Sequence, residues 1–161
     1  VYNPEFLTQY NYITDFIKPS MQIYGGPKWA CRELSNLYKW HSLVDCSTEY
    51  LVDIETASLV KYSINSFLGT KVTFMNMLYD IHSKANCSST FEEFTTILST
   101  DIRIGKSHLR VPGTDNKFGF GGACLPKDTV AFEKYCIKIG ANGKLIATVM
   151  DINETYRNSA N

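Results

Sequence analysis

The chain has 161 residues, of which 44% are apolar, 13% aromatic and 20% charged, and this is the composition of a globular protein with one sizeable core. Sixteen basic and sixteen acidic residues balance, and no apolar run approaches the roughly 20 residues of a membrane span, so neither nucleic acid nor a membrane is an expected partner. The five cysteines are odd in number and dispersed, without a C-x-x-C pair or histidines at metal spacing. They indicate reduced thiols in a cytoplasmic protein rather than a disulfide framework or a metal site.

The first part of the chain, residues 1–47, predicts the C-terminal edge of an α/β domain. Residues 21–26 are typical of a short strand that ends in a glycine turn, residues 28–39 of an amphipathic helix, and residues 41–46 of a second strand. Two short strands around one helix do not make a stable sheet alone. We therefore expect the larger part of that domain to precede Val1.

Residues 48–161 predict a mainly helical domain built on one long helix. From about residue 48 to residue 84 the sequence has no proline and a single glycine, which permits one helix roughly 50 Å long. Apolar residues on more than one side of it predict burial by more than one neighbour. Lys61 and Asn65 lie one turn apart on the same face. Two interpretations remain open: a lysine that extends to solvent, or a cation and an amide that bind a ligand oxyanion together.

Three shorter helices are predicted after the long one. Thr90, with Glu93 three residues later, predicts the start of a helix over residues 91–98. Residues 101–108 and 111–116 are typical of turns and loops. Helices over residues 128–139 and 144–157 then follow, separated by a glycine-containing break at residues 140–143.

A glycine-rich stretch that ends in a cysteine contains more candidate site residues than any other part of the sequence. Gly119, Gly121 and Gly122 suit a loop wrapped around a small polar ligand. Cys124 lies just before Pro126, which fits the first turn of the next helix, so the helix N-terminus and Lys127 would both favour the thiolate. The alternatives are a poised nucleophile and a half-buried structural cysteine after a glycine turn.

This stretch resembles the active-site signature of the nucleotide-sugar 6-dehydrogenases, the UDP-glucose/GDP-mannose dehydrogenase family. The similar residues are Gly119-Phe120-Gly121-Gly122, Cys124 and the pair Lys127-Asp128. Segments 3–7, 61–68 and 101–105 also match the family, in its order. The resemblance implies a central helical dimerisation domain, preceded by the end of a Rossmann-like NAD-binding domain.

The resemblance implies a four-electron oxidation of the C6 alcohol of UDP-glucose to a carboxylate, with two NAD+ reduced in succession. Cys124 would attack the intermediate aldehyde to give a thiohemiacetal and then a thioester. Lys61 and Asn65 would stabilise the oxyanion, Asp128 would position or activate water, and Glu5 would assist thioester hydrolysis.

Binding roles follow from the same resemblance. Lys127 resembles a cofactor contact, and Arg103 resembles an arginine that reaches into the site of the neighbouring subunit of a homodimer formed through the long helix. Residues 5–9 and the loop at residues 117–122 resemble the segments that contact the UDP-sugar in this family. The expected substrate contacts are Phe6, Leu7, Arg103, Lys117, Phe118, Gly119, Phe120, Gly121 and Gly122.

The sequence departs from the family in two respects. Residues 8–12 are polar and aromatic where the family has a charged, glycine-containing continuation, and Ser20-Met21 replaces a common arginine. No G-x-G-x-x-G is present, so we expect the chain to be inactive alone. The alternatives are a sibling enzyme acting on GDP-mannose or a UDP-N-acetylhexosamine, a non-catalytic dimerisation module, and a thiol redox protein.

Overall fold

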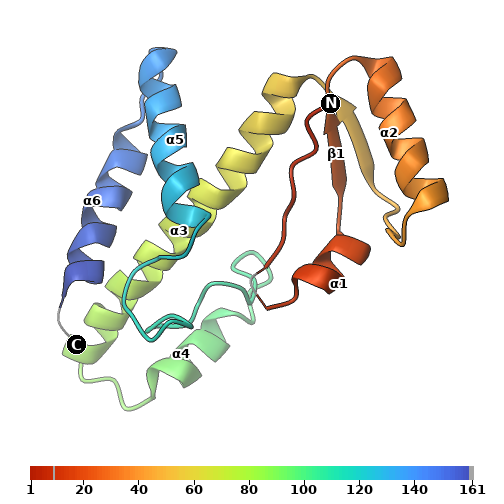
Figure 1. Cartoon of the computed structure of the whole chain (residues 1–161). Coiled ribbons are helices and arrows are strands. Elements are labelled where there is room, and N and C mark those ends of the chain that lie inside the picture. Colours follow the sequence, from red (N-terminus) through yellow and green to blue (C-terminus); the bar gives the residue numbers. More distant parts are fainter. Residues whose placement is uncertain (9, 160–161) are drawn as a thin grey trace. The chain divides into compact units, whose positions relative to one another are not determined.

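The computed structural model describes residues 1–8 and 10–159, which form two compact units, Val1–Ser63 and Ile64–Asn161. Figure 1 labels the elements in chain order. The division falls inside the long helix α3, which spans Ile54–Lys84. The domain boundary predicted after residue 47 differs from this division, which follows contacts within the chain, and it stays a prediction.

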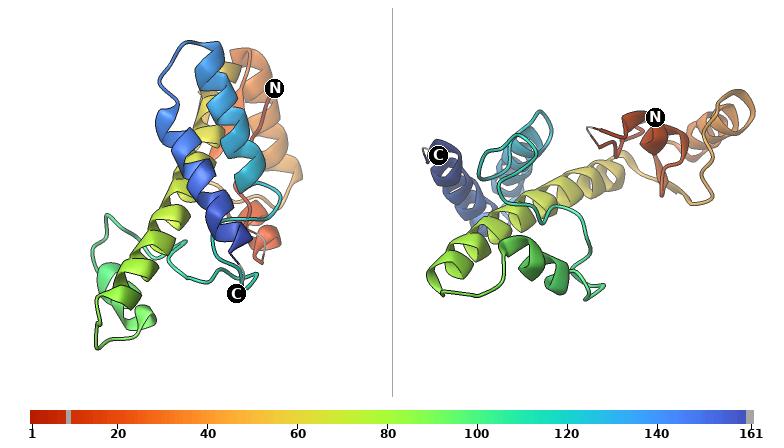
Figure 2. Two further views of the ribbon diagram at one scale, coloured as in Figure 1. Left: turned by 90° about the vertical axis from the view of Figure 1, so that its left-hand side faces the viewer. Right: turned by 90° about the horizontal axis from the view of Figure 1, so that it is seen from below.

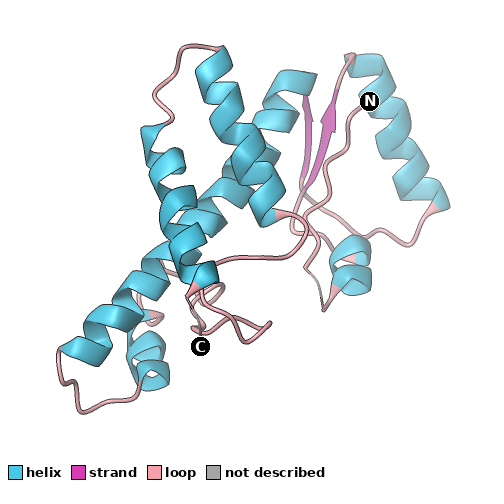
Figure 3. Ribbon diagram, turned by 60° about the vertical axis from the view of Figure 1, so that its left-hand side comes forward, coloured by secondary structure: helices cyan, strands magenta, loops and turns pink. Residues whose placement is uncertain are grey.

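The first unit contains a small parallel sheet. Strand β1 (Gln22–Gly25) pairs with strand β2 (Glu49–Val52), with Gln22 opposite Glu49, and the two strands lie side by side in Figure 3. Helix α2 (Lys28–His41) connects them, and the short helix α1 (Tyr12–Ile17) precedes β1. All four residues of β1 are buried, so this strand forms the core of the unit.

The strand predicted over residues 41–46 is wrong. Helix α2 continues through His41, and the following residues form a loop in which Leu43 is 81% exposed. The second strand instead begins at Glu49, whose carboxylate accepts hydrogen bonds from Ser35 and Lys39 of α2. These bonds help to place Glu49 opposite Gln22 of β1, and local sequence pattern did not indicate a strand at this position.

Helix α3 confirms the prediction of one long helix, but it begins at Ile54 rather than near residue 48. Asp53 accepts hydrogen bonds from the backbone N–H and the hydroxyl of Thr56 at 2.6 and 2.8 Å, and such a cap stabilises a helix start. Residues of the three helices that follow α3 in the chain contact it, so more than one neighbour packs on it as predicted, but one side of the helix stays exposed. An apolar row that includes Phe67, Phe74 and Ile81 is 50 to 68% exposed.

The second unit places three helices around its part of α3. Helix α4 (Phe91–Leu98) begins at a capping box in which Thr90 and Glu93 bond each other's backbone N–H groups. Helices α5 (Leu125–Lys138) and α6 (Lys144–Asn158) pack side by side, as two directions of view agree (Figures 1 and 2). The three helices predicted here are confirmed. Among the described residues, none of the helices is long and apolar enough to cross a membrane.

Candidate active site

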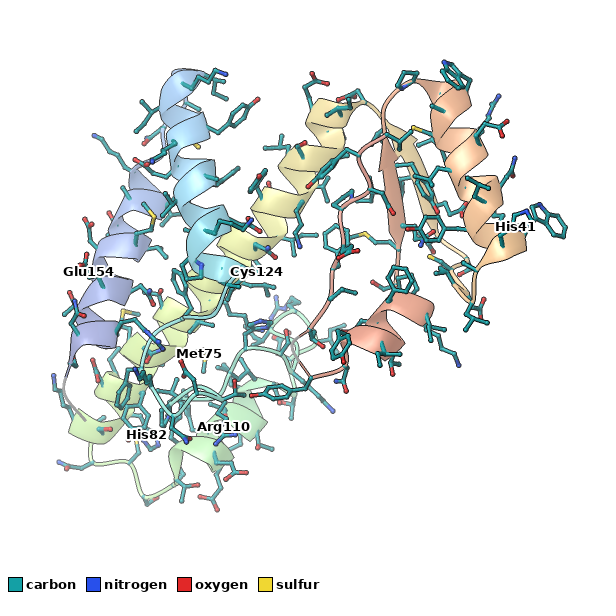
Figure 4. All side chains as sticks on the ribbon, in the orientation of Figure 1. His41, Met75, His82, Arg110, Cys124 and Glu154 are labelled. Atoms are coloured by element: carbon teal, nitrogen blue, oxygen red, sulfur yellow. The ribbon has the colours of Figure 1, made fainter. Side chains whose placement is uncertain are left out.

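The glycine loop, which contains Gly119, Gly121 and Gly122 and ends at Cys124, runs from the interior of the second unit to its surface. Gly119 is buried and Phe120 is 4% exposed, whereas Gly122 and Cys124 are exposed. Cys124 occupies the N-cap position of α5, and its label in Figure 4 lies at the start of that helix. The thiol is therefore accessible at a helix N-terminus, as the sequence predicts for a reactive cysteine.

Two buried asparagines hold the inner part of this loop. The N–H of Gly119 donates to Oδ1 of Asn76 in α3 at 3.0 Å. The N–H of Phe120 donates to Oδ1 of Asn153 in α6 at 2.6 Å, and Nδ2 of Asn153 donates back to the carbonyl of Phe120 at 3.1 Å. The loop backbone is thus hydrogen-bonded to two helices.

The three glycines of the loop have different surroundings. A Cβ on Gly119 would lie 2.5 Å from Oδ1 of Asn153, and one on Gly121 would lie 2.8 Å from Nη2 of Arg157. Gly122 has a positive φ of 78° and no atom within 4 Å of a Cβ position. Two of the glycines therefore make room for α6, and only Gly122 faces open space.

Asn65 and Asp128 meet at the start of α5. Nδ2 of Asn65 donates to Oδ2 of Asp128 at 2.5 Å, and Nζ of Lys127 lies 2.5 Å from Oδ1 of the same carboxylate. Asp128 is 2% exposed and Asn65 is 7% exposed, so the buried carboxylate is satisfied by a buried amide and by a lysine whose side chain is 69% exposed. The structure thus brings together three of the residues predicted as site residues.

In the first unit, the predicted residue Lys61 contacts the predicted segment near the N-terminus. Its Nζ donates to the backbone carbonyl of Glu5 at 2.5 Å and lies 5.1 Å from the ring centroid of Phe6. The side chain of Glu5 is exposed, and Leu7 is 38% exposed. Gln9, the last residue of the predicted sugar-contact segment, lies outside the described residues.

The remaining predicted contacts divide between packing and exposure. The ring of Phe118 packs on Tyr79 with 5.5 Å between ring centroids. Lys117 is exposed, and the side chain of Arg103 is 84% exposed. The guanidinium of Arg103 pairs with Asp101 at 2.5 Å, and this hydrogen bond lowers the pKa of Asp101 and raises that of Arg103.

Comparison with known proteins identifies the family. A sequence profile of the UDP-glucose/GDP-mannose dehydrogenase family, central domain, matches residues 55–155, which is more than half of the chain. The chain belongs to this family. The family predicted from the glycine and cysteine motif is therefore confirmed.

Individual members of the UDP-glucose/GDP-mannose dehydrogenase family are similar over most of the chain. The UDP-glucose 6-dehydrogenase of Rickettsia felis is 30% identical over 154 residues, which cover 94% of this chain and 32% of that protein. The solved UDP-glucose dehydrogenase of Pyrobaculum islandicum superposes with a TM-score of 0.79 at 32% identity, over 95% of this chain and 33% of that one. A GDP-mannose dehydrogenase from Pseudomonas aeruginosa gives 0.54 at 26% identity, over 96% and 34% of the two chains. The chain thus spans about a third of the length of these relatives.

The sequence analysis did not predict the three residues that contact the glycine loop from other helices, Asn76, Asn153 and Arg157. Each lies on a helix far from the loop in sequence, so no local motif contains it. A signal was nevertheless present for Asn153, because it follows Ile146 and Val149 on the buried face of α6. A polar side chain on such a face needs a hydrogen-bonding partner.

Helix α6 is also tied down at its C-terminal end. Nη1 of Arg157 lies 2.6 Å from Oδ2 of Asp115, and this hydrogen bond lowers the pKa of the Asp115 carboxyl. The hydroxyl of Tyr156 donates to Asp80 of α3 at 2.9 Å. Burial, together with that bond, raises the pKa of Tyr156 to about 12. The phenol therefore stays a hydrogen-bond donor throughout the physiological pH range.

The turn between β1 and α2 does not offer its glycine N–H groups to a phosphate. Strand β1 leads through Gly25 and Gly26 into α2, a strand–turn–helix order in which free N–H groups could bind phosphate. Here the N–H of Gly25 donates to the carbonyl of Tyr2, and the N–H of Gly26 donates to that of Val52. Residues 1–8 and 10–159 likewise contain no group of three or more His, Cys, Asp and Glu side chains placed to hold a metal ion.

Proposed function

We propose that this chain is the central part of a NAD-dependent enzyme that oxidises the C6 alcohol of UDP-glucose to the carboxylate of UDP-glucuronate. Family membership and the names of the relatives support this class of reaction. The observation that carries the proposal is an exposed thiol, that of Cys124, at the end of a glycine loop and at the N-terminus of α5. A buried carboxylate and amide lie at the start of the same helix.

In the proposed reaction, Cys124 makes the second oxidation possible. After the alcohol has become an aldehyde, the thiolate adds to the C6 carbon, a C–S bond forms, and the carbonyl oxygen becomes an oxyanion that takes up a proton. The thiohemiacetal then loses a hydride from C6 to NAD+ and its hydroxyl proton to solvent, which gives a thioester. Water adds to the thioester carbonyl and the C–S bond breaks, which releases the carboxylate and the thiol. NAD+, bound chiefly by a domain outside this chain, accepts the two hydrides.

The neighbouring polar residues have separate proposed roles. Lys61 supplies a cation and Asn65 an amide donor to the oxyanion at C6, while Asp128 orients the attacking water and Glu5 assists hydrolysis. The bond from Nδ2 of Asn65 to Asp128 supports part of this assignment, since it fixes the direction of the amide and leaves its second N–H available. Lys127 is proposed to contact NAD through its exposed ammonium group.

A sibling activity is the second candidate. The similarity to a GDP-mannose dehydrogenase is structural evidence for the shared fold, at a lower TM-score than the similarity to a UDP-glucose dehydrogenase. The higher scores and the names of the sequence relatives favour UDP-glucose. A non-catalytic dimerisation module is disfavoured because Lys61, Asn65, Cys124 and Asp128 are all retained.

The proposed function predicts a fixed stoichiometry. The full-length protein that contains this chain should form two NADH for each UDP-glucose consumed, because both oxidations occur at the same carbon. Absorbance at the NADH band, with UDP-glucuronate measured by chromatography, gives this ratio. A ratio of one, or faster turnover of GDP-mannose or a UDP-N-acetylhexosamine, would reject UDP-glucose as the substrate. The 161-residue chain alone should form no NADH.

We also propose a homodimer that forms through α3. Phe67, Phe74 and Ile81 recur every seven residues, so they lie along one face of the helix, and they are 68%, 50% and 52% exposed. A row of large apolar side chains on one helix face is typical of a surface that another helix covers. A second copy of the chain would offer the same row in return, as a two-fold interface requires.

Placing charges in this row should separate the two subunits. Wild-type chain is expected to have twice its monomer mass of 18.2 kDa in solution, and the double variant Phe67→Glu/Phe74→Glu the monomer mass, because burying two carboxylates against apolar side chains is costly. Light scattering after size exclusion measures both masses. Leu145→Glu, which changes an apolar residue 66% exposed on α6, serves as the control and should stay dimeric. A monomeric wild type, or a dimeric double variant, would contradict the proposed interface.

A further inference from the structure

We infer that helix α6 sets the position of the Cys124 loop, and that Asn153 and Arg157 are positioning residues for the reacting thiol. The hydrogen bonds of both residues go to other positions than Cys124. Both act on the backbone several residues before it. The inference rests on the proposed function only in treating Cys124 as a reacting group.

Asn153 forms two hydrogen bonds with the backbone of a single loop residue, Phe120. Its amide oxygen accepts from the N–H of Phe120, and its amide nitrogen donates to the carbonyl of Phe120, at 2.6 and 3.1 Å. Asn153 is 9% exposed and Phe120 is 4% exposed, so water does not replace either bond easily. This reciprocal pairing fixes both the place and the orientation of the peptide at residue 120.

The ring of Phe120 adds a third restraint. A Cβ on Gly69 of α3 would lie 3.3 Å from one ring carbon and 3.4 Å from the next, so the ring rests directly against the helix backbone. The same glycine position lies 3.3 Å from Oγ1 of Thr129, a fully buried residue in the first turns of α5. Phe120 is therefore wedged between α3 and α5 while α6 holds its backbone.

Arg157 closes the other side of the loop. Its side-chain carbons lie 3.2 Å from the Cβ position of Gly119, and its guanidinium lies 2.8 to 3.0 Å from that of Gly121. The guanidinium also pairs with Asp115, which precedes the glycines in the same loop. Arg157 thus occupies the space beneath the loop and links its beginning to α6.

These restraints leave only a short free segment. Residues 121–124 connect Phe120, held by α6, to α5, whose first turns are fixed by buried Asp128 and Thr129. Four residues can reach few positions between two fixed ends. The side of the loop at Gly119 and Gly121 is filled by α6, so a ligand approaches from the open side at Gly122.

Hydrogen exchange on the folded chain tests this clamp without any turnover. In Asn153→Ala, the amides of Gly119 and Phe120, the two loop N–H groups that donate to buried asparagines, should exchange at least roughly tenfold faster, since a buried hydrogen bond that contributes about 1.4 kcal/mol is lost from the loop. Amides in the middle of α5 and α6 should keep their rates, and the buried thiol of Cys136 should stay protected from alkylation, which shows that the unit remains folded. Glu154→Ala, which changes an exposed neighbour on α6 (Figure 4), should leave every rate unchanged.

Kinetics of the full-length protein supply the second readout. Asn153→Ala and Arg157→Ala should each lower kcat by roughly 10- to 100-fold, the cost of a misplaced reacting group, with KM for the sugar nucleotide changed little. Asn153→Asp, which keeps the acceptor for the N–H of Phe120, should recover part of the loss. Unchanged exchange at Gly119 and Phe120 would overturn the clamp, whatever the activity. Faster exchange with an unchanged kcat would overturn the positioning role, whereas failure of the proposed function itself would appear as turnover that does not need Cys124.

Discussion

Replacing Cys124 with serine in the full-length protein should lower the steady-state turnover of UDP-glucose by a factor of roughly 10³ to 10⁶, the range seen when a covalent nucleophile is removed. The serine hydroxyl is almost fully protonated near neutral pH and is a poor nucleophile toward an aldehyde. The first oxidation does not require the thiol, so a single equivalent of NADH per active site should still form. Rapid-mixing absorbance would show this burst followed by very slow turnover.

The control for this variant is another exposed cysteine. Cys87→Ser removes a thiol that is equally free and exposed but lies outside the glycine loop, and it should leave turnover unchanged. Mass spectrometry of enzyme quenched during turnover should find the sugar acyl group on Cys124 in wild type and absent in Cys124→Ser. Intact turnover in Cys124→Ser would rule out the covalent mechanism.

Exchanging Asn65 for aspartate should destabilise the second unit by about 3 kcal/mol at pH 8, the scale of an uncompensated buried charge. The substitution keeps size and shape but sets two carboxylates 2.5 Å apart at positions that are 7% and 2% exposed. Both cannot be ionised there, so the folded chain must retain a proton that the unfolded chain has released. Lys127 already pairs with Asp128 and offsets only part of this repulsion.

The sign of the pH dependence follows from that retained proton. Because the folded variant binds more protons than the unfolded chain, its stability decreases as pH rises and recovers as pH falls, by up to about 1.4 kcal/mol per pH unit above pH 4. Urea unfolding of wild type and variant at pH 5 and pH 8 measures the difference. The double variant Asn65→Asp/Asp128→Asn restores one amide and one carboxylate, and it should regain most of the stability. Equal stability of Asn65→Asp and wild type at pH 8 would show that the two side chains are not in contact.

Local sequence signals predicted the helices of this chain well. Thr90 and Glu93 make the expected capping box, and α4 begins and ends at the predicted residues. The period of the apolar residues also located α2, α6 and the C-terminal end of α3 to within a few residues. These elements depend on hydrogen bonds within a few residues of each other, which is the information that sequence spacing carries.

Two elements, β2 and α1, were not predicted correctly from the sequence. Strand β2 was predicted too early, since its position is fixed by pairing with β1 and by the bonds from Ser35 and Lys39 to Glu49. Helix α1 has no buried residue, and its 6 residues are too few for their apolar spacing to identify a helix. The failure at β2 reflects tertiary contacts overriding weak local preference, whereas α1 was missed because it is short.

The candidate site shows the same division. The residue types Cys124, Asp128 and Asn65 could be named from motif and family resemblance. The bond between Asn65 and Asp128, and the grip of Asn153 on Phe120, join residues 63 and 33 positions apart, and they required the folded chain. Sequence thus predicted candidate reactive groups, while the structure showed which side chains hydrogen-bond to them and to the loop.

Gly69 carries a consequence for any attempt to make this protein more thermostable. A glycine inside a helix lowers helix stability by about 1 kcal/mol relative to alanine, so Gly69→Ala is an obvious candidate in a stabilising library. The added methyl group would meet the ring of Phe120 and Oγ1 of Thr129 at 3.3 Å. Phe120 or Thr129 would have to shift to accommodate it, and Phe120 is the residue whose backbone Asn153 holds. A substitution chosen for helix propensity in α3 would therefore also change the position of the segment that precedes Cys124.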